Sequence, residues 1–176
     1  MDTYKLRWTA LEQALFKLLC ERVGEKLSQR DLAKFLKVSP TAIAHTLQGL
    51  GNLVKIEKTK TIHFVSLNRD DRQAIQFKRI VNLQSVYSSN LVQYLETELA
   101  GTTVVLFGSY ALGEDTIRSD IDLAVIERKS KPLNLAKYEK ALNRKINLNF
   151  YPDWKIQEHL KNNILNGIVL QGGIEL

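Results

Sequence analysis

Apolar side chains in the first part of the chain follow a helical period three times and then alternate with polar ones. Their spacing predicts an amphipathic helix over residues 8–23. A serine followed three residues later by aspartate opens the second predicted helix, Ser28–Leu36, and Ser-Pro opens the third, Ser39–Leu50. Alternating residues then predict a β-hairpin with strands at Leu53–Ile56 and Ile62–Val65.

The next stretch, residues 70–99, contains neither Gly nor Pro and predicts one long amphipathic helix. Apolar residues at steps of three or four would line one face of it: Ile80, Leu83, Tyr87, Leu91, Tyr94 and Leu95. Such a helix either connects two domains or pairs with its copy in a homodimer. We take the connector as the simpler interpretation.

The last part of the chain alternates predicted strands and helices, which is typical of a small α/β domain. The expected strands are Thr103–Phe107, Ile121–Ile126, Ile146–Phe150 and a strand-like tail at Ile168–Leu170; the expected helices are Ser109–Gly113, Leu135–Leu142 and Trp154–Leu165. The overall fold class is therefore mixed, α+β with α/β. We expect domains at 1–68 and 100–176 joined by a linking helix at 69–99, the second domain having a small mixed sheet flanked by helices.

Charge is unevenly distributed. The whole chain carries a net +6, and residues 1–68 hold 11 Lys and Arg against 6 Asp and Glu, a net of +5. This excess favours a polyanionic partner for the N-terminal part, although a well-solvated surface is the alternative interpretation. The single cysteine, Cys20, cannot form an internal disulfide. Without an export signal or a bilayer-spanning apolar run, we expect a cytoplasmic protein with no membrane partner.

Residues 32–47 resemble a helix-turn-helix, and with the hairpin the segment 8–68 is similar to the winged-helix family. The resemblance implies DNA binding, although some winged helices bind only protein. The third helix would enter the major groove, and the wing lysines would meet phosphates. Candidate base contacts are Thr41, Ala42, His45, Thr46 and Gln48, and candidate phosphate contacts are Lys55, Lys58 and Lys60. That helix carries no Arg or Lys, and His45 could equally be an exposed residue without a role.

Gly108 and Ser109 stand where a predicted strand turns into a helix. Glycine permits a sharp turn there, and free amides at a helix start together with the Ser109 hydroxyl can hold a phosphate. Asp120 and Asp122 alternate on the following strand, so both side chains point to one face and can hold Mg²⁺. For an isolated Asp-x-Asp, two loop-capping, solvated aspartates would be the simpler interpretation.

Together, Gly-Ser, ten residues and Asp-x-Asp resemble the nucleotidyltransferase superfamily related to DNA polymerase beta, in its minimal branch. The resemblance covers about residues 101–170. It implies that Gly108 and Ser109 grip the triphosphate of ATP or another nucleoside triphosphate. It also implies that Asp120 and Asp122 are catalytic and bind Mg²⁺ ions that align attack on the α-phosphate.

Two residues depart from the family pattern. Leu112 stands where members commonly have Arg or Lys. Asn147 stands where active members usually place a third carboxylate, and an amide carries no charge and cannot act as a base. Glu139, Glu114 and Asp115 are candidates to replace that carboxylate.

Three functions follow from these observations. The first is transfer of AMP to a partner hydroxyl, as by antitoxins of this family that modify a tyrosine of a HEPN-type toxin. The second is a DNA-binding transcriptional regulator whose impaired nucleotidyltransferase domain senses nucleotide, which Asn147 and Leu112 favour. An autoregulated antitoxin would combine both. The third, a plain interaction module, gives the two aspartates no purpose.

Overall fold

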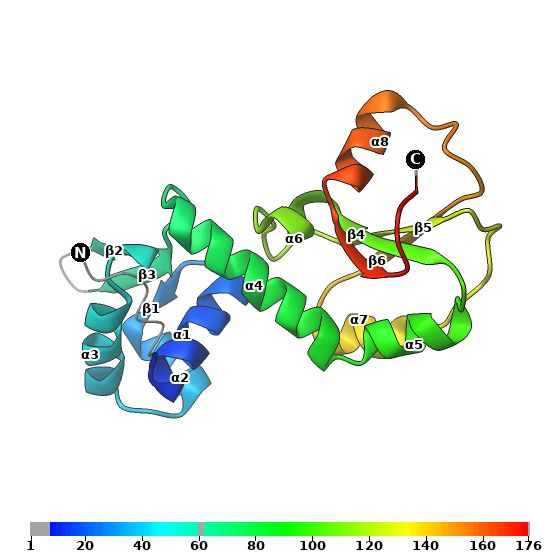
Figure 1. Cartoon of the computed structure of the whole chain (residues 1–176). Coiled ribbons are helices and arrows are strands. Elements are labelled where there is room, and N and C mark those ends of the chain that lie inside the picture. Colours follow the sequence, from blue (N-terminus) through cyan, green and yellow to red (C-terminus); the bar gives the residue numbers. More distant parts are fainter. Residues whose placement is uncertain (1–7, 60–61, 176) are drawn as a thin grey trace. The chain divides into compact units, whose positions relative to one another are not determined.

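The computed structural model describes residues 8–59 and 62–175 of the chain. The chain divides into two compact units, Met1–Ile75 and Gln76–Leu176, each with its own sheet (Figure 1).

The first unit is built from three helices and a three-stranded antiparallel sheet of order β1-β3-β2. Its elements are α1 (Ala10–Glu21), β1 (Leu27–Ser28), α2 (Gln29–Leu36), α3 (Pro40–Leu50), the 3₁₀ turn η1 (Gly51–Leu53), β2 (Val54–Lys58) and β3 (His63–Leu67). This order and pairing are those of a winged helix-turn-helix. The three helices and the hairpin are confirmed, whereas the short strand β1 was not predicted.

The helix starts follow from local hydrogen bonds. Thr9 and Glu12 form a capping box at α1, and Ser28 and Asp31 form the predicted one at α2. The hydrogen bonds from the Ser28 side chain and backbone lower the pKa of Asp31. Ser39 accepts a bond from a backbone amide at the start of α3. These side chains satisfy amides that the first helical turn leaves without a partner.

The second unit contains a four-stranded mixed sheet of order β6-β5-β4-β7, flanked by helices as predicted. Strands β5 and β6 are parallel, and the other pairs are antiparallel. From the helix that crosses the unit boundary onward, the elements are α4 (Arg72–Ser88), α5 (Leu91–Glu98), β4 (Thr103–Phe107), α6 (Gly108–Leu112), β5 (Ile121–Ile126), α7 (Ala136–Leu142), β6 (Ile146–Tyr151), α8 (Glu158–Leu165) and β7 (Ile168–Gln171).

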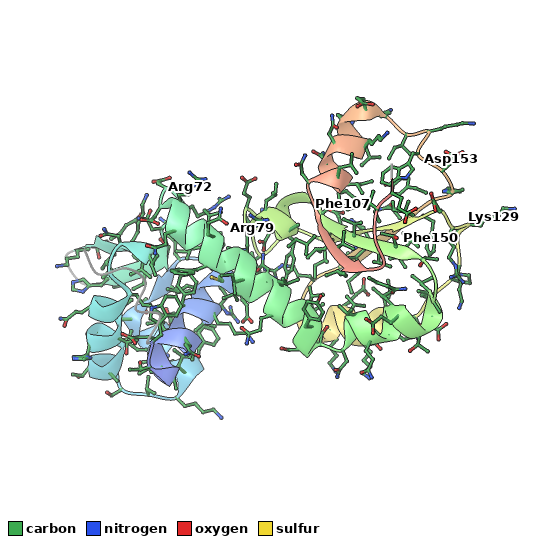
Figure 2. The ribbon with its side chains drawn as sticks, viewed as in Figure 1. Arg72, Arg79, Phe107, Lys129, Phe150 and Asp153 are labelled. Atoms are coloured by element: carbon green, nitrogen blue, oxygen red, sulfur yellow. The ribbon has the colours of Figure 1, made fainter. Side chains whose placement is uncertain are left out.

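Both faces of this sheet are covered. Side chains of α5 and α7, including Leu91 and Tyr138, pack on one face, and Ile164 of α8 packs on the other. The two labelled phenylalanines, Phe107 and Phe150, belong to these two separate apolar clusters (Figure 2). Because side chains alternate along β5, Asp122 shares the face of Ala124, which packs with the α8 cluster.

The long helix predicted over residues 70–99 is wrong: the structure has two helices, α4 and α5. Asn90 takes a left-handed conformation (φ 62°) between them, which asparagine tolerates better than most residues. The break lets Leu91 and Leu95 enter the core, while Ile80 and Tyr87 stay exposed. The apolar residues of the stretch therefore do not form one face.

The last helix is also shorter than predicted, since α8 begins at Glu158 rather than Trp154. Asp153 accepts a hydrogen bond from the Lys155 amide at 2.8 Å, which forms a turn in place of a helical start. Trp154 and Ile156 pack on the apolar cluster beneath α8. Tertiary packing therefore accounts for the apolar residues that suggested helix.

Candidate functional site

Gly108 brings the end of β4 against Asp122. Phe107 pairs with Asp122 across the antiparallel strands, and Gly108 then turns the chain with φ +74°. A Cβ atom at this position would lie 2.7 Å from the Oδ2 atom of Asp122. Glycine is thus needed twice, for the left-handed turn and for the approach of the carboxylate.

Asp120 and Asp122 converge on one point. Asp122 lies on β5, inside the sheet, and Asp120 directly precedes that strand. Both side chains are partly exposed. The Nδ2 atom of Asn147 is 3.2 Å from Oδ2 of Asp120 and 3.1 Å from Oδ1 of Asp122, so one amide group donates to both carboxylates.

The parallel register of β5 and β6 places Asn147 opposite Asp122. Asn147 therefore occupies the position on the neighbouring strand that the sequence pattern predicted. Its amide partly offsets the repulsion between two carboxylates that face each other, because N–H groups carry partial positive charge. The cluster has two negative charges and one neutral member.

The other acidic candidates do not complete this cluster. Among residues 8–59 and 62–175, no group of three or more His, Cys, Asp or Glu side chains could hold a metal ion. The Glu139 carboxylate accepts a bond from the Ile146 amide at 3.0 Å, and Asp115 is buried with Lys78. Neither Glu139, Glu114 nor Asp115 therefore replaces the third carboxylate.

The candidate DNA face on α3 is largely exposed. Thr41, His45 and Gln48 are exposed, and Ala42 is half-buried. Thr46 departs from the expectation, since it is only 6 % exposed and its hydroxyl donates to the Ala42 carbonyl at 2.8 Å. We therefore leave Thr46 out of the DNA face.

The wing lysines lie on and beyond β2. Lys55 and Lys58 are both exposed on this strand. Lys55 forms an ion pair with Asp70, and the ammonium group lowers the pKa of that carboxyl. Lys60 lies outside the described residues. The structure thus leaves Lys58 exposed to solvent and gives Lys55 a carboxylate partner that DNA would have to displace.

Residues 88–170 match the family model described as a nucleotidyltransferase domain. The chain carries a nucleotidyltransferase domain. The matched region includes Gly108, Ser109, Asp120, Asp122 and Asn147. A comparison with curated proteins found none that matches the chain.

Two similar solved structures are bacterial proteins of low identity. A single-residue mutant of ZitR from Lactococcus lactis is 18% identical, with 56% of this chain and 66% of that chain covered and a TM-score of 0.41. The heme sensor protein PefR from Streptococcus agalactiae, in complex with heme, is 20% identical, with 55% and 63% covered and a TM-score of 0.36. The chain thus spans just under two thirds of each. Both TM-scores are below 0.5, so neither similarity indicates a function for this chain.

The nucleotidyltransferase domain presents a donor set that suits one hard divalent cation. Asp120 and Asp122 supply carboxylate oxygens, which Mg²⁺ prefers, and such sites are commonly completed by water and substrate phosphates. Asn147 can add its carbonyl oxygen if its amide turns over, because the N–H side now faces the two carboxylates. The chemistry of these donors is therefore compatible with Mg²⁺.

Three further residues of the domain lie on α6 and β6. Ser109 is the second residue of the five-residue helix α6, and Leu112, at its end, is 40% exposed. Tyr151, at the end of β6, was not singled out from the sequence. Burial raises the pKa of Tyr151, and the negative charge of Asp122 raises it further. The Tyr151 hydroxyl therefore stays protonated at neutral pH.

In the described part of the chain, none of the helices has the length and apolar character needed to cross a membrane.

Proposed function

We propose that the nucleotidyltransferase domain binds a nucleoside triphosphate together with Mg²⁺ and transfers a nucleoside monophosphate, AMP in the case of ATP, to a hydroxyl of a partner, with pyrophosphate as the leaving group. The observation that carries this proposal is the convergence of Asp120 and Asp122 on one point beside the Gly108 turn. A tyrosine hydroxyl of a HEPN-type toxin is one acceptor of this chemical class, which would make the protein an antitoxin.

In this reaction the chain's own residues bind and orient. Gly108 leaves room for the triphosphate by keeping a side chain out of the turn, and Ser109 can donate its hydroxyl to a phosphate oxygen. Asp120 and Asp122 fix the cation, which when bound neutralises phosphate charge. Asn147 cannot accept the proton of the attacking hydroxyl. These residues therefore support the binding of nucleotide and cation more than they support catalytic transfer.

The first test is a calorimetric titration of Mg²⁺·ATP into the native protein and into Asp120→Asn. We expect the variant to bind about tenfold more weakly, because one of two charged ligands is lost. Asp153→Asn is the matched control, since Asp153 is exposed beyond β6 and asparagine preserves its turn. Equal affinities for native protein and Asp120→Asn would refute the proposed cation site.

Transfer is tested separately with labelled ATP, Mg²⁺ and candidate acceptor proteins. Label should reach the acceptor with native protein and not with the Asp120→Asn/Asp122→Asn double variant. The same labelling with both proteins would exclude transfer by this domain.

A second candidate function is a DNA-binding regulator whose nucleotidyltransferase domain senses nucleotide without turnover. The neutral Asn147 favours it, since the described residues offer no third carboxylate at the site. The exposed residues Thr41, His45 and Gln48 on α3 support the DNA-binding half of the proposal.

For this candidate we expect the Lys55→Glu/Lys58→Glu variant to lose affinity for the protein's own upstream DNA. The slope of log affinity against log salt should also fall by about 0.9 for each phosphate that the variant no longer neutralises. Fluorescence anisotropy over a range of salt concentrations measures both. Lys137→Glu/Lys140→Glu, on exposed positions of α7, makes the same charge change away from the wing. If the two double variants bind alike, the wing does not contact DNA.

A further inference from the structure

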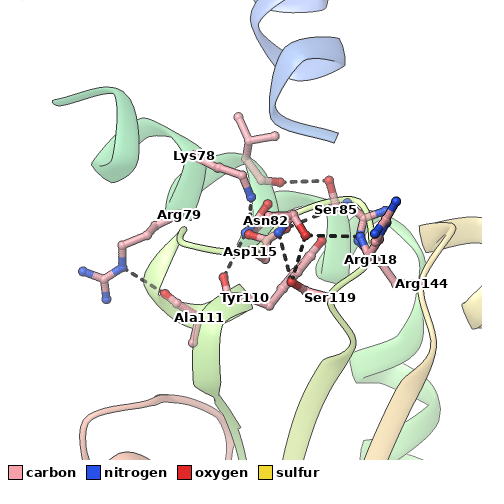
Figure 3. A network of polar contacts seen from close by, with 12 residues as sticks. Lys78, Arg79, Asn82, Ser85, Tyr110, Ala111, Asp115, Arg118, Ser119 and Arg144 are labelled. Atoms are coloured by element: carbon pink, nitrogen blue, oxygen red, sulfur yellow. Dashed lines mark hydrogen bonds and ion pairs between the residues drawn. The ribbon is translucent and has the colours of Figure 1, made fainter. Parts of the chain in front are cut away.

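The second unit buries a charged cluster that has no part in the proposed function. Lys78 and Asp115 are each 1% exposed and form an ion pair, and Arg144 is 8% exposed (Figure 3). The Nδ2 atom of Asn82 donates to Oδ1 of Asp115 at 2.7 Å. A guanidinium nitrogen of Arg144 lies 3.9 Å from the other carboxylate oxygen, Oδ2. Asp115 is therefore the centre of the cluster.

The cluster joins α4 to the loop that precedes Asp120 and to the start of β6, the strand that carries Asn147. Lys78 and Asn82 lie on α4, Asp115 lies in the loop between α6 and β5, and Arg144 directly precedes Lys145 at the start of β6. That loop reaches Asp120 five residues after Asp115. The carbonyl of Lys145 accepts a hydrogen bond from the Ile121 amide at 2.8 Å, where the parallel pairing of β5 and β6 begins.

Helix α4 also holds α6 from the same side. Asn82 donates to the Tyr110 carbonyl at 2.9 Å, and the Nε atom of Arg79 donates to the Ala111 carbonyl at 2.9 Å (Figure 3). Residues of α4 thus hold both α6, which begins at Gly108, and the loop that leads to Asp120.

Burying three charges is costly, and apolar residues of similar size commonly serve folding equally well. The cost of burying these charges therefore indicates that the cluster has a role beyond packing. From this arrangement we infer that the net charge of Lys78, Asp115 and Arg144 sets how tightly Asp120 and Asp122 hold a divalent cation. This inference rests on the proposed function, since it assumes a cation at Asp120 and Asp122.

Each substitution in the cluster changes its charge in a known direction, and this direction gives the inference a sign. A buried positive charge near the site repels a cation and attracts an anionic triphosphate, and low-polarity surroundings screen both effects weakly. Removing the negative charge of Asp115 should weaken cation binding and strengthen metal-free ATP binding. Removing the positive charge of Lys78 should do the reverse. A purely structural loosening would weaken both.

The experiment measures Mn²⁺ binding by electron paramagnetic resonance and ATP binding in EDTA by calorimetry. The proteins are native, Asp115→Asn, Lys78→Met and the double variant Lys78→Met/Asp115→Asn. We expect Asp115→Asn to bind Mn²⁺ about tenfold more weakly and Lys78→Met several-fold more tightly, with opposite shifts for ATP. The double variant restores the native net charge and should return both affinities toward native values.

Shifts of equal sign for Mn²⁺ and ATP, or a double variant worse than both single variants, would overturn the inference. If circular dichroism shows that Asp115→Asn is unfolded, the test becomes a comparison of Lys78→Met with the double variant. The inference then requires that Lys78→Met binds Mn²⁺ more tightly than native protein and that the double variant does not. If the native protein binds no Mn²⁺ with or without ATP, the proposed function and this inference fail together. If Asp120→Asn abolishes Mn²⁺ binding but the charge series changes nothing, only this inference fails.

Discussion

Replacing Gly108 by alanine is expected to weaken the binding of Mg²⁺·ATP about a hundredfold. The new Cβ atom would lie 2.7 Å from Oδ2 of Asp122, too close for the carboxylate to keep its place. A displaced Asp122 no longer meets Asp120 at the point where the Asn147 amide joins them. Calorimetric titration of Mg²⁺·ATP into the native and variant proteins measures the effect.

Gly101→Ala is the matched control for this prediction. Gly101 also has a left-handed conformation, with φ +75°, but nothing lies within 4 Å of an added Cβ. Both substitutions should cost about 1 kcal/mol of unfolding free energy in urea because of the backbone conformation. Only Gly108→Ala should lose nucleotide affinity. Equal affinities for the two variants would mean that the approach of Asp122 to Gly108 has no part in binding.

Much of the fold could be predicted because local signals and tertiary packing agree. Ser28 with Asp31 begins α2, and Ser39 begins α3, since each side chain satisfies backbone amides of its own helix. The strands β4 and β5 lie at the predicted residues because a buried central strand needs a continuous apolar run.

The elements that could not be predicted depend on distant contacts. Asn90 breaks the predicted helix because the sheet accepts Leu91 and Leu95 into its core. The strand β1 is two residues long and exists through its pairing with β3. Trp154 lies in a turn that packs against the apolar cluster beneath α8. In the sequence, its apolar side chain cannot be distinguished from one on the buried face of a helix.

The candidate site also contains some residues that the sequence reveals and others that depend on distant contacts. Gly108, Asp120 and Asp122 could be singled out because the Gly-Ser and Asp-x-Asp motifs stand close together in the sequence. Asn147 could be matched because the third strand follows in order, and the parallel register agrees. Lys78 gives no signal, since a lysine on a helix normally faces solvent, and its partner Asp115 lies 37 residues away.

Replacing Asn147 by aspartate is expected to convert the pair of carboxylates into a set of three and to raise Mg²⁺ affinity tenfold or more, by an order-of-magnitude estimate from ligand charge. In the native protein, the Nδ2 atom of Asn147 lies 3.2 Å from Oδ2 of Asp120 and 3.1 Å from Oδ1 of Asp122. Without metal, three carboxylates repel one another, so the variant should melt below the native protein in EDTA. With Mg²⁺, it should gain more stability than the native protein does, since a ligand that binds only the folded state stabilises it.

Asn149→Asp is the control, because Asn149 lies two residues further on the same face of β6 and its side chain contacts only the Asn147 carbonyl among the described hydrogen bonds. Thermal melts in EDTA and in Mg²⁺ should separate the two variants, and labelled ATP then reports transfer. If Asn147→Asp gains transfer that the native protein lacks, the missing charge limits turnover and the native domain acts as a nucleotide sensor. If the native protein transfers AMP as well as the variant does, two carboxylates suffice and the enzyme interpretation prevails. Melting curves that respond to Mg²⁺ identically in Asn147→Asp and Asn149→Asp would contradict the prediction, because the third charge would then lie outside the cation's reach.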